Sequence, residues 1–401
     1  MVAANEPLAA ALLARLREET ETMVAETERL AAIDSGSGDA DGIARVCEAL
    51  GTILGDSGFA VARRDEGGLT ATHPGADADG RRVLVVGHAD TVWPAGTAAG
   101  WPVRRAGDLL SGPGVGDMKG CLVMAAHAVA AARDAGALAG VGAIELLVVP
   151  DEELGSVGSR PWIEDRARHA DVCLGLEAGW PGGGLDVARG AVGALELVAA
   201  GRSAHAGGHE GTGASAVAAL APAVAELERL SRPEHEMLVT VGVFRGGVAR
   251  QVVPDHAELH IDLRAPSTER ADELVAGIEA VVEGARSRAG EVGLELRGGV
   301  TRPAFPRAAA QWLWERAVAH AAALRIPVWE VHSRGGSDAS FAAALGLPTL
   351  DGLGPICHDS CARDERIEIS SLATRGALMG LLLADVGADV QARSGNVDAP
   401  A

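Results

Sequence analysis

The chain has 401 residues, of which 48% are hydrophobic, 22% are charged and only 3% are aromatic, and its formal net charge at pH 7 is −20. A chain of this length is too long for one ordinary hydrophobic core, so two domains are expected. The composition is that of a globular rather than a disordered protein. The acidic charge argues against nucleic acid and anionic membrane surfaces as partners, although local cations can still favour a small acidic substrate.

Residues 1–38 are predicted to form acidic amphipathic helices. They lack the basic start and the uninterrupted apolar segment of a secretory signal. We also expect no membrane span, since no apolar run approaches the roughly 18 residues that a span needs. The five cysteines are an odd number scattered along the chain, which suggests reduced thiols. We therefore expect a cytoplasmic protein.

Strand-like and helical runs then alternate as far as residue 179. The aliphatic run 81–92 predicts a buried strand, and a Gly-rich loop leads from it to the Ala-rich helix 119–136. The strand 143–153, a short helix and the strand 170–179 follow. This alternation indicates an α/β fold in which helices pack against a mixed sheet.

The segment 190–301 has a different pattern and is predicted to be an inserted domain. Its apolar residues alternate with polar ones, as in a half-exposed antiparallel sheet. The expected elements are a strand from residue 193, a helix over 213–230, strands over 237–247 and 257–266, a helix over 268–290 and a strand over 293–300. This order is the ferredoxin-like split arrangement. Residues 1–189 and 302–401 would then form the two parts of the first domain, whose second part completes the sheet.

Acidic residues and histidines follow the predicted strands of the first domain. His88 and Asp90 end one strand and share a face, because residues at i and i+2 of a strand project to the same side. The other candidates lie in loops after strands or before a helix: Asp117, Glu152, Glu153, Glu177 and His358. Open α/β sheets bind their ligands beyond the carboxyl ends of the strands, so we expect these side chains to meet there.

This set of side chains indicates a metal centre. Several carboxylates in one place would repel one another and become protonated unless cations neutralised them. Taken singly, His88 would more often be a hydrogen-bonded core histidine and Asp117 a helix cap. Imidazoles and carboxylates without a cysteine pair suit zinc and two-metal hydrolytic sites. We therefore interpret His88 as a metal ligand and Asp90 as the residue that orients it.

The motifs around these residues resemble those of the co-catalytic zinc peptidases and amidohydrolases. That family includes bacterial glutamate carboxypeptidase, acetylornithine deacetylase, succinyl-diaminopimelate desuccinylase and aminoacylase. The matching segments run in the family's order over nearly the whole chain: "GHADTV", "GPGVGDMKG", "PDEELGS", "LEAG", "RSAHAG" and "GPICHDS". The likeness is greatest to the glutamate carboxypeptidase branch, partly because Glu177 stands where other branches have aspartate.

The resemblance implies two zinc ions in each subunit. His88 and Glu177 would hold one ion, Glu153 and His358 would hold the other, and Asp117 would bridge them. Zinc lowers the pKa of bound water to about 7 and polarises a carbonyl group.

Catalytic roles follow from the same resemblance. Glu152 would be the general base that takes a proton from the shared water and passes it to the leaving nitrogen. In the family the inserted domain forms a homodimer and contributes a histidine to the partner subunit's site, where it stabilises the oxyanion. His205 matches that position, although a histidine at the end of a strand is as often only a polar surface residue.

Substrate contacts are predicted in and beside the inserted domain. Arg264 matches the arginine that binds the substrate's free carboxylate, although a lone arginine at a strand end is ordinarily solvated or paired. Arg302 and the turn that contains Gly336 and Asp338 are weaker candidates. Gln251 stands where the family usually has asparagine. Its side chain keeps the amide but is one methylene longer, which bears on substrate choice or on the geometry of the inserted domain as a lid.

Other motifs argue against competing functions. "GPGVGDMKG" has Asp117 in place of the third glycine of a dinucleotide fingerprint and lacks the Ser or Thr of a phosphate-binding loop. No serine nucleophile elbow is present. Cys357 and Cys361 flank His358 and are interpreted as free thiols rather than as a zinc knuckle.

The predicted function is hydrolysis of the amide bond of an N-acyl amino acid or peptide-like substrate that has a free carboxylate. A deacylase or carbamoyl-amidohydrolase acting on another N-acyl or ureido acid is the alternative within enzymes. A metal-bound binding protein without hydrolytic activity is a further alternative, which the presence of Glu152 disfavours.

Overall fold

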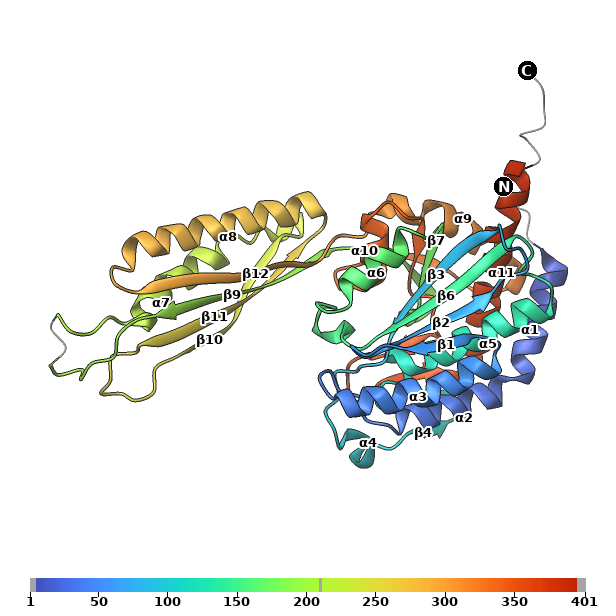
Figure 1. Cartoon of the computed structure of the whole chain (residues 1–401), viewed down its shortest axis with the longest axis horizontal. Helices are drawn as coiled ribbons and strands as arrows, with labels where there is room; N and C mark the ends of the chain where they lie inside the picture. The colour runs from blue at the N-terminus through green and yellow to red at the C-terminus, as the bar shows by residue number, and fades with distance from the viewer. Residues whose placement is uncertain (1–4, 209–210, 395–401) are drawn as a thin grey trace, which may run out of the picture. The chain divides into compact units, whose positions relative to one another are not determined.

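The computed structural model describes residues 5–208 and 211–394, with side chains as far as residue 388 (Figure 1). The chain divides into two compact units. The first comprises residues 1–188, 306–332 and 337–401, and the second comprises 189–305 with the short segment 333–336. The predicted insert of 190–301 lies within the second unit.

The first unit is built on a six-stranded mixed sheet, as predicted. Its strand order is β1-β2-β6-β3-β7-β14, in which β6, β3, β7 and β14 run parallel and β1 and β2 are antiparallel additions at one edge. The strands are β1 (Ala60–Arg63), β2 (Leu69–Pro74), β3 (Arg81–His88), β6 (Val141–Val149), β7 (Val172–Gly175) and β14 (Thr349–Leu350). The strand β14 comes from the C-terminal part of the chain, so that part completes the sheet.

Helices cover both faces of this sheet (Figure 1). One face packs against α6 and α10 through Trp162, Ile163 and Phe341, and α11 lies on β3 and β6. The helices are α1 (Glu6–Glu18), α2 (Thr20–Ala31), α3 (Ala40–Asp56), α4 (Thr97–Gly100), α5 (Gly120–Asp134), α6 (Arg160–Ala167), α9 (Arg307–Leu324), α10 (Ala339–Ala344) and α11 (Ile369–Ser394). Because β3 is buried on both faces, its sequence is a continuous aliphatic run rather than an alternating one.

Gly87, near the end of β3, packs closely against α5 and the turn before it. A Cβ there would lie 2.9 Å from a methyl group of Leu122 and 3.0 Å from the sulfur of Met118, so the ends of these two side chains would have to shift to admit a larger residue. Asp117 lies in this turn and His88 ends this strand.

Two helical segments are longer and more apolar than the sequence analysis expected. Val115–Asp134 and Ile369–Ala388 both have the length and composition of a membrane span. However, 83% and 78% of these segments are buried inside the protein, as in the core helices of a globular fold. Their apolar character therefore has a sufficient explanation in packing.

The second unit has the predicted strand–helix–strand–strand–helix–strand order. Its elements are β9 (Ala191–Ala200), α7 (Ala216–Glu228), β10 (Leu238–Gly246), β11 (His256–Ala265), α8 (Thr268–Arg288) and β12 (Gly293–Arg302). The antiparallel sheet has the order β10-β11-β9-β12, and α7 and α8 cover one of its faces (Figure 1). Every second residue of β9 and β11 is buried against these helices, which accounts for the alternating pattern in the sequence.

The remaining strands form two smaller sheets. A second four-stranded sheet has the order β15-β16-β5-β4, and β13 pairs with β8. These strands are β4 (Arg104–Ala106), β5 (Leu109–Ser111), β8 (Gly184–Arg189), β13 (Trp329–Ser333), β15 (Cys357–His358) and β16 (Arg366–Glu368).

Candidate metal centre

Three parallel strands bring the predicted ligands to one edge of the first sheet. In the register, His88 at the end of β3 lies opposite Val149, the last residue of β6, and Val86 lies opposite Gly175, the last residue of β7. Glu152 and Glu153 follow β6 after a two-residue link, and Glu177 follows β7. The carboxyl ends of parallel strands form the ligand-binding edge of such sheets.

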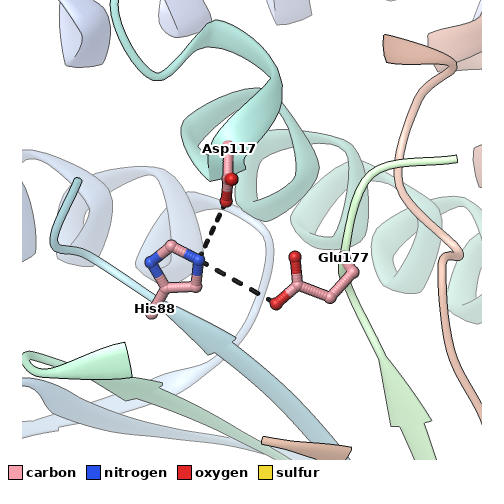
Figure 2. A group of neighbouring side chains, drawn as sticks. All are labelled: His88, Asp117 and Glu177. Carbon is pink, nitrogen blue, oxygen red and sulfur yellow. Dashed lines mark hydrogen bonds and ion pairs between the residues drawn. The ribbon is translucent and has the colours of Figure 1, made fainter. Parts of the chain in front are cut away.

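His88, Asp117 and Glu177 form the first group of potential ligands (Figure 2). The Nε2 atom of His88 lies 3.1 Å from an oxygen of Asp117 and 4.0 Å from an oxygen of Glu177. One ligand atom from each residue lies within 4.8 Å of the others. His88 is only 1% exposed, so its imidazole reaches the group from the protein interior.

Asp90 fixes the orientation of His88. The Nδ1 atom of His88 lies 2.9 Å from the backbone oxygen of Asp90, which can only accept, so Nδ1 donates and Nε2 faces the carboxylates. The Asp90 carboxylate is buried and accepts the backbone N–H groups of Glu152 (3.1 Å) and Glu153 (3.2 Å). It also accepts the hydroxyl of Ser37 at 2.7 Å, a contact that the sequence analysis missed. Asp90 therefore positions both the histidine and the acidic loop after β6.

The second group of potential ligands consists of Asp117, Glu153 and Cys361, again with ligand atoms within 4.8 Å of one another. The second oxygen of Asp117 accepts the hydroxyl of Ser360 at 2.8 Å and lies 3.2 Å from the sulfur of Cys361. Asp117 therefore belongs to both groups and presents a different oxygen to each.

His358 lies outside both groups, although it was predicted to be a ligand. Its Nε2 atom is 2.9 Å from an oxygen of Glu368, across the antiparallel pair that β15 and β16 form. The structure thus brings together His88, Asp117, Glu153 and Glu177, and the second group also includes Cys361 but not His358.

Glu365 supports the Asp117 turn and was not recognised in the sequence. It is 0% exposed, and one of its oxygens accepts the backbone N–H groups of Gly116 (2.9 Å) and Asp117 (3.1 Å). Burial raises the pKa of Glu365 to about 7. No local pattern distinguishes this residue from the charged residues beside it, because its partners lie almost 250 positions away.

The electrostatics of the centre favour added positive charge. Burial raises the pKa of Glu153 to about 8, and the neighbouring Asp117 adds to this effect. Burial, followed by the charges of Asp117 and Glu152, also holds the pKa of Glu177 well above its usual range. Burial acts against ionisation of Asp117 too, but its hydrogen bond and charge pairing with His88 lower its pKa to about 2.

The pKa of His88 is raised, whereas that of its partner Asp117 is lowered. Burial by itself lowers the pKa of His88, but its bonds to Asp117 and Asp90 outweigh that effect and raise the pKa well above the usual value. Without a cation, the centre therefore compensates for its crowded carboxylates by holding protons. A divalent metal ion would supply that positive charge instead.

The donor set fits divalent metal ions. It combines an imidazole, three carboxylates and a thiol, which are the donor types that zinc and related ions bind. In addition, one oxygen of Glu153 is buried and has no hydrogen-bond partner among the described residues. Buried polar atoms are nearly always paired, and a cation bound by this group would give the unpaired carboxylate oxygen a partner.

Two of the predicted catalytic and substrate-binding residues lie on neighbouring backbone segments of the second unit. His205 is exposed, and its Nδ1 atom accepts the N–H of Gly207 at 3.1 Å, so the neutral ring carries its proton on Nε2. Gln251 is also exposed, and its backbone oxygen accepts the N–H of Ala206 at 2.9 Å.

The two predicted arginines lie in different surroundings in the second unit. Arg264 forms a two-pronged pair with Asp262, with nitrogen–oxygen distances of 2.8 and 2.9 Å. Arg302 is buried, and its aliphatic stem lies 2.3 Å from the point where Gly336 would carry a Cβ, so that position requires glycine. Asp338, in the first unit, accepts the hydroxyl of Ser156 and so anchors the loop after β6.

Comparison with known proteins identifies the class to which this fold and centre belong. Residues 84–385 match the family described as Peptidase family M20/M25/M40, and the chain belongs to this family. Its members are metal-dependent hydrolases that act on small peptide or acyl substrates. The predicted family and enzyme class are therefore confirmed.

Among curated proteins, the chain is 28% identical over 380 residues to carboxypeptidase G2 of Pseudomonas sp. (strain RS-16), covering 92% of this chain and 91% of that protein. It is 29% identical over 262 residues to succinyl-diaminopimelate desuccinylase of Afipia carboxidovorans, covering 58% and 66%.

Solved structures share the fold over nearly the whole chain. Aminopeptidase PepT from Bacillus cereus superposes with a TM-score of 0.73 at 25% identity, covering 92% of this chain and 98% of that one. An M20 family metallo-carboxypeptidase from Sulfolobus solfataricus has a TM-score of 0.71 at 16% identity, covering 92% and 99%.

We predict that the metal-free protein becomes less stable as the pH rises. The pKa of Glu153 is about 8 in the folded protein against 4.5 in an unfolded chain, so between these values the folded state binds more protons. Stability then falls with increasing pH. Thermal denaturation in a chelating buffer should show the melting temperature decreasing from about pH 5 to pH 8, and saturating zinc should remove much of this dependence.

Two variants identify the source of this dependence. Glu153→Gln should flatten the decrease, whereas Glu48→Gln, on an exposed position of α3, should leave it unchanged. A melting temperature that rises across this range in the metal-free protein would contradict the electrostatic account.

Proposed function

We propose that this protein is a two-metal hydrolase that cleaves an amide bond next to a free carboxylate, as in an N-acyl amino acid or a peptide C-terminus. The observation that carries the proposal is that Asp117 presents one oxygen to each of two ligand groups. A carboxylate shared in this way is suited to bridging two metal ions. The extended similarity to carboxypeptidase G2 supports a carboxypeptidase-like reaction.

In this proposal His88 and Glu177 would hold one zinc ion, Glu153 would hold the second, and Asp117 would contribute an oxygen to each. His358 remains a predicted ligand of the second ion, for which its imidazole would have to exchange Glu368 for the metal. When bound, the ions would polarise the scissile carbonyl and lower the pKa of a water molecule.

Glu152 is proposed to move the proton. It is buried, its backbone is held by Asp90, and its charge acts on Glu153, Glu177 and His88. Its backbone N–H and that of the potential ligand Glu153 are held by the same carboxylate, that of Asp90. From that position it can take a proton from the attacking water and deliver it to the leaving nitrogen.

We further propose that the protein is a homodimer in which His205 acts on the site of the partner subunit. The exposed Nε2–H of His205 supports a role as a donor to a developing oxyanion. The edge strands β10 and β12 of the second unit offer surfaces for a two-fold contact. A reducing, cytoplasmic location is also proposed, in keeping with the free thiols of the described chain.

Arg264 is the proposed receptor for the substrate's carboxylate. Its planar fork already binds the Asp262 carboxylate with both prongs, which is the geometry that a substrate carboxylate would adopt. The substrate would have to displace Asp262 or share the guanidinium with it. If neither occurs, a deacylase or carbamoyl-amidohydrolase that recognises another group becomes the better description.

We predict that Glu152→Gln lowers kcat by about 10²- to 10⁴-fold while both metal ions stay bound, because the change removes a proton acceptor and not a ligand. Glu153→Gln is the matched control: it alters the adjacent residue in the same way but should lose metal. Elemental analysis and turnover of N-acyl amino acids check both. Near-normal turnover by Glu152→Gln would show that the base is a different residue.

The carboxylate requirement predicts that the wild-type enzyme cleaves an N-acyl-glutamate much faster than its α-amide. Arg264→Ala should lower kcat/KM for the acid by about 30- to 1000-fold, equivalent to about 2 to 4 kcal/mol, and should reduce the difference between the two substrates. Arg45→Ala, which removes an exposed arginine of α3 in the first unit, is the control and should change little. Equal cleavage of acid and amide by wild type would rule out carboxylate recognition.

The dimer proposal predicts complementation between two inactive variants. Mixing Glu152→Gln with His205→Ala subunits should restore activity, because some hybrid sites would combine an intact base with an intact partner histidine. Subunit exchange is verified independently by mass spectrometry of differently labelled chains. No recovery after verified exchange would show that His205 does not act in trans.

A further inference from the structure

Cys361 lies inside the metal centre rather than beside it. Its sulfur is 3.2 Å from the Asp117 oxygen that faces away from His88, and it forms a group with Asp117 and Glu153 whose ligand atoms lie within 4.8 Å of one another. The residue follows the strand β15 and is exposed, so the thiol is accessible to ions from solvent.

We propose that Cys361 is a thiolate ligand of the metal ion held by Asp117 and Glu153. This inference rests on the proposed two-metal function and adds a ligand to it. Catalytic zinc sites usually have three protein ligands and an open position for water. As the side chains stand in the structure, Asp117, Glu153 and Cys361 form one group of three potential ligands, and His88, Asp117 and Glu177 form the other.

The surroundings of Glu153 and His358 support this assignment. One oxygen of Glu153 is buried and has no hydrogen-bond partner among the described residues. A cation bound by the group that contains Cys361 would give this oxygen a partner. The imidazole of His358 lies 2.9 Å from an oxygen of Glu368. Cys361, and not His358, belongs to the group that contains Asp117 and Glu153.

A thiolate would make the two metal positions chemically different. Metal binding displaces the proton of the thiol to solvent and forms the sulfur–metal bond, without oxidation or reduction. Thiolate is a softer ligand than carboxylate or imidazole, so the position at Cys361 should favour zinc, cobalt or cadmium over manganese and magnesium. The position at His88, with imidazole and carboxylates, should discriminate less among these ions.

Cobalt absorption spectroscopy of the full-length protein tests this proposal directly. When two cobalt ions per chain are bound, the wild type should show a thiolate-to-cobalt charge-transfer band in the near ultraviolet. Cys361→Ser should lose the band and bind the second ion at least about tenfold more weakly. Cys47→Ser, which alters a buried cysteine of α3, should keep the band.

Alkylation of the unmodified protein gives a second measurement that does not depend on any variant. Saturating zinc should slow the reaction of Cys361 with iodoacetamide, as followed by peptide mass spectrometry. A wild-type chain that binds two cobalt ions without the band, or a band that persists in Cys361→Ser, would overturn this inference and leave the two-metal function standing. A chain that binds no metal would overturn both.

Discussion

The position of one carboxylate, that of Asp117, determines how the rest of the centre is arranged. One of its oxygens faces His88, and the other faces Ser360 and Cys361. Its backbone is held by Glu365, and the turn that carries it packs against Gly87 near the end of β3. A shift of this turn would therefore separate both ligand groups at once. The buried acid Glu365 thus supports the metal centre from outside the set of potential ligands.

Burial of several carboxylates in one place is costly unless positive charge compensates for it. In this chain the compensation without metal is protonation, which appears as the raised pKa values of Glu153 and Glu177. Family membership supplies the other solution, a metal ion, and the geometry offers a place for one on each side of Asp117. The same electrostatic need thus links the fold, in which three parallel strands end together, to hydrolytic chemistry. It also explains how a strongly acidic chain could accept an anionic substrate, since bound cations would reverse the local charge.

Much of the fold was predictable because its signals are local. The aliphatic run of β3 and the alternating pattern of the second unit follow directly from which faces are buried. The positions of the potential ligands at the ends of parallel strands were predictable for the same reason, since the strand positions fix where His88 and Glu177 emerge. Length and composition alone do not separate a core helix from a membrane span, because apolar core helices such as α11 share both features with a span and differ in their surroundings.

The features that could not be predicted depend on loops and on contacts between distant residues. The pairing of His358 with Glu368, the burial of Glu365 and the approach of Cys361 to Asp117 all arise from how one loop folds over the turn before α5. Anomalous X-ray diffraction at the zinc edge, from crystals of the zinc-loaded protein, tests the central claim most directly. The account predicts two peaks about 3.5 to 4 Å apart, one on each side of the Asp117 carboxylate. A single peak, or peaks that do not contact Asp117, would contradict it.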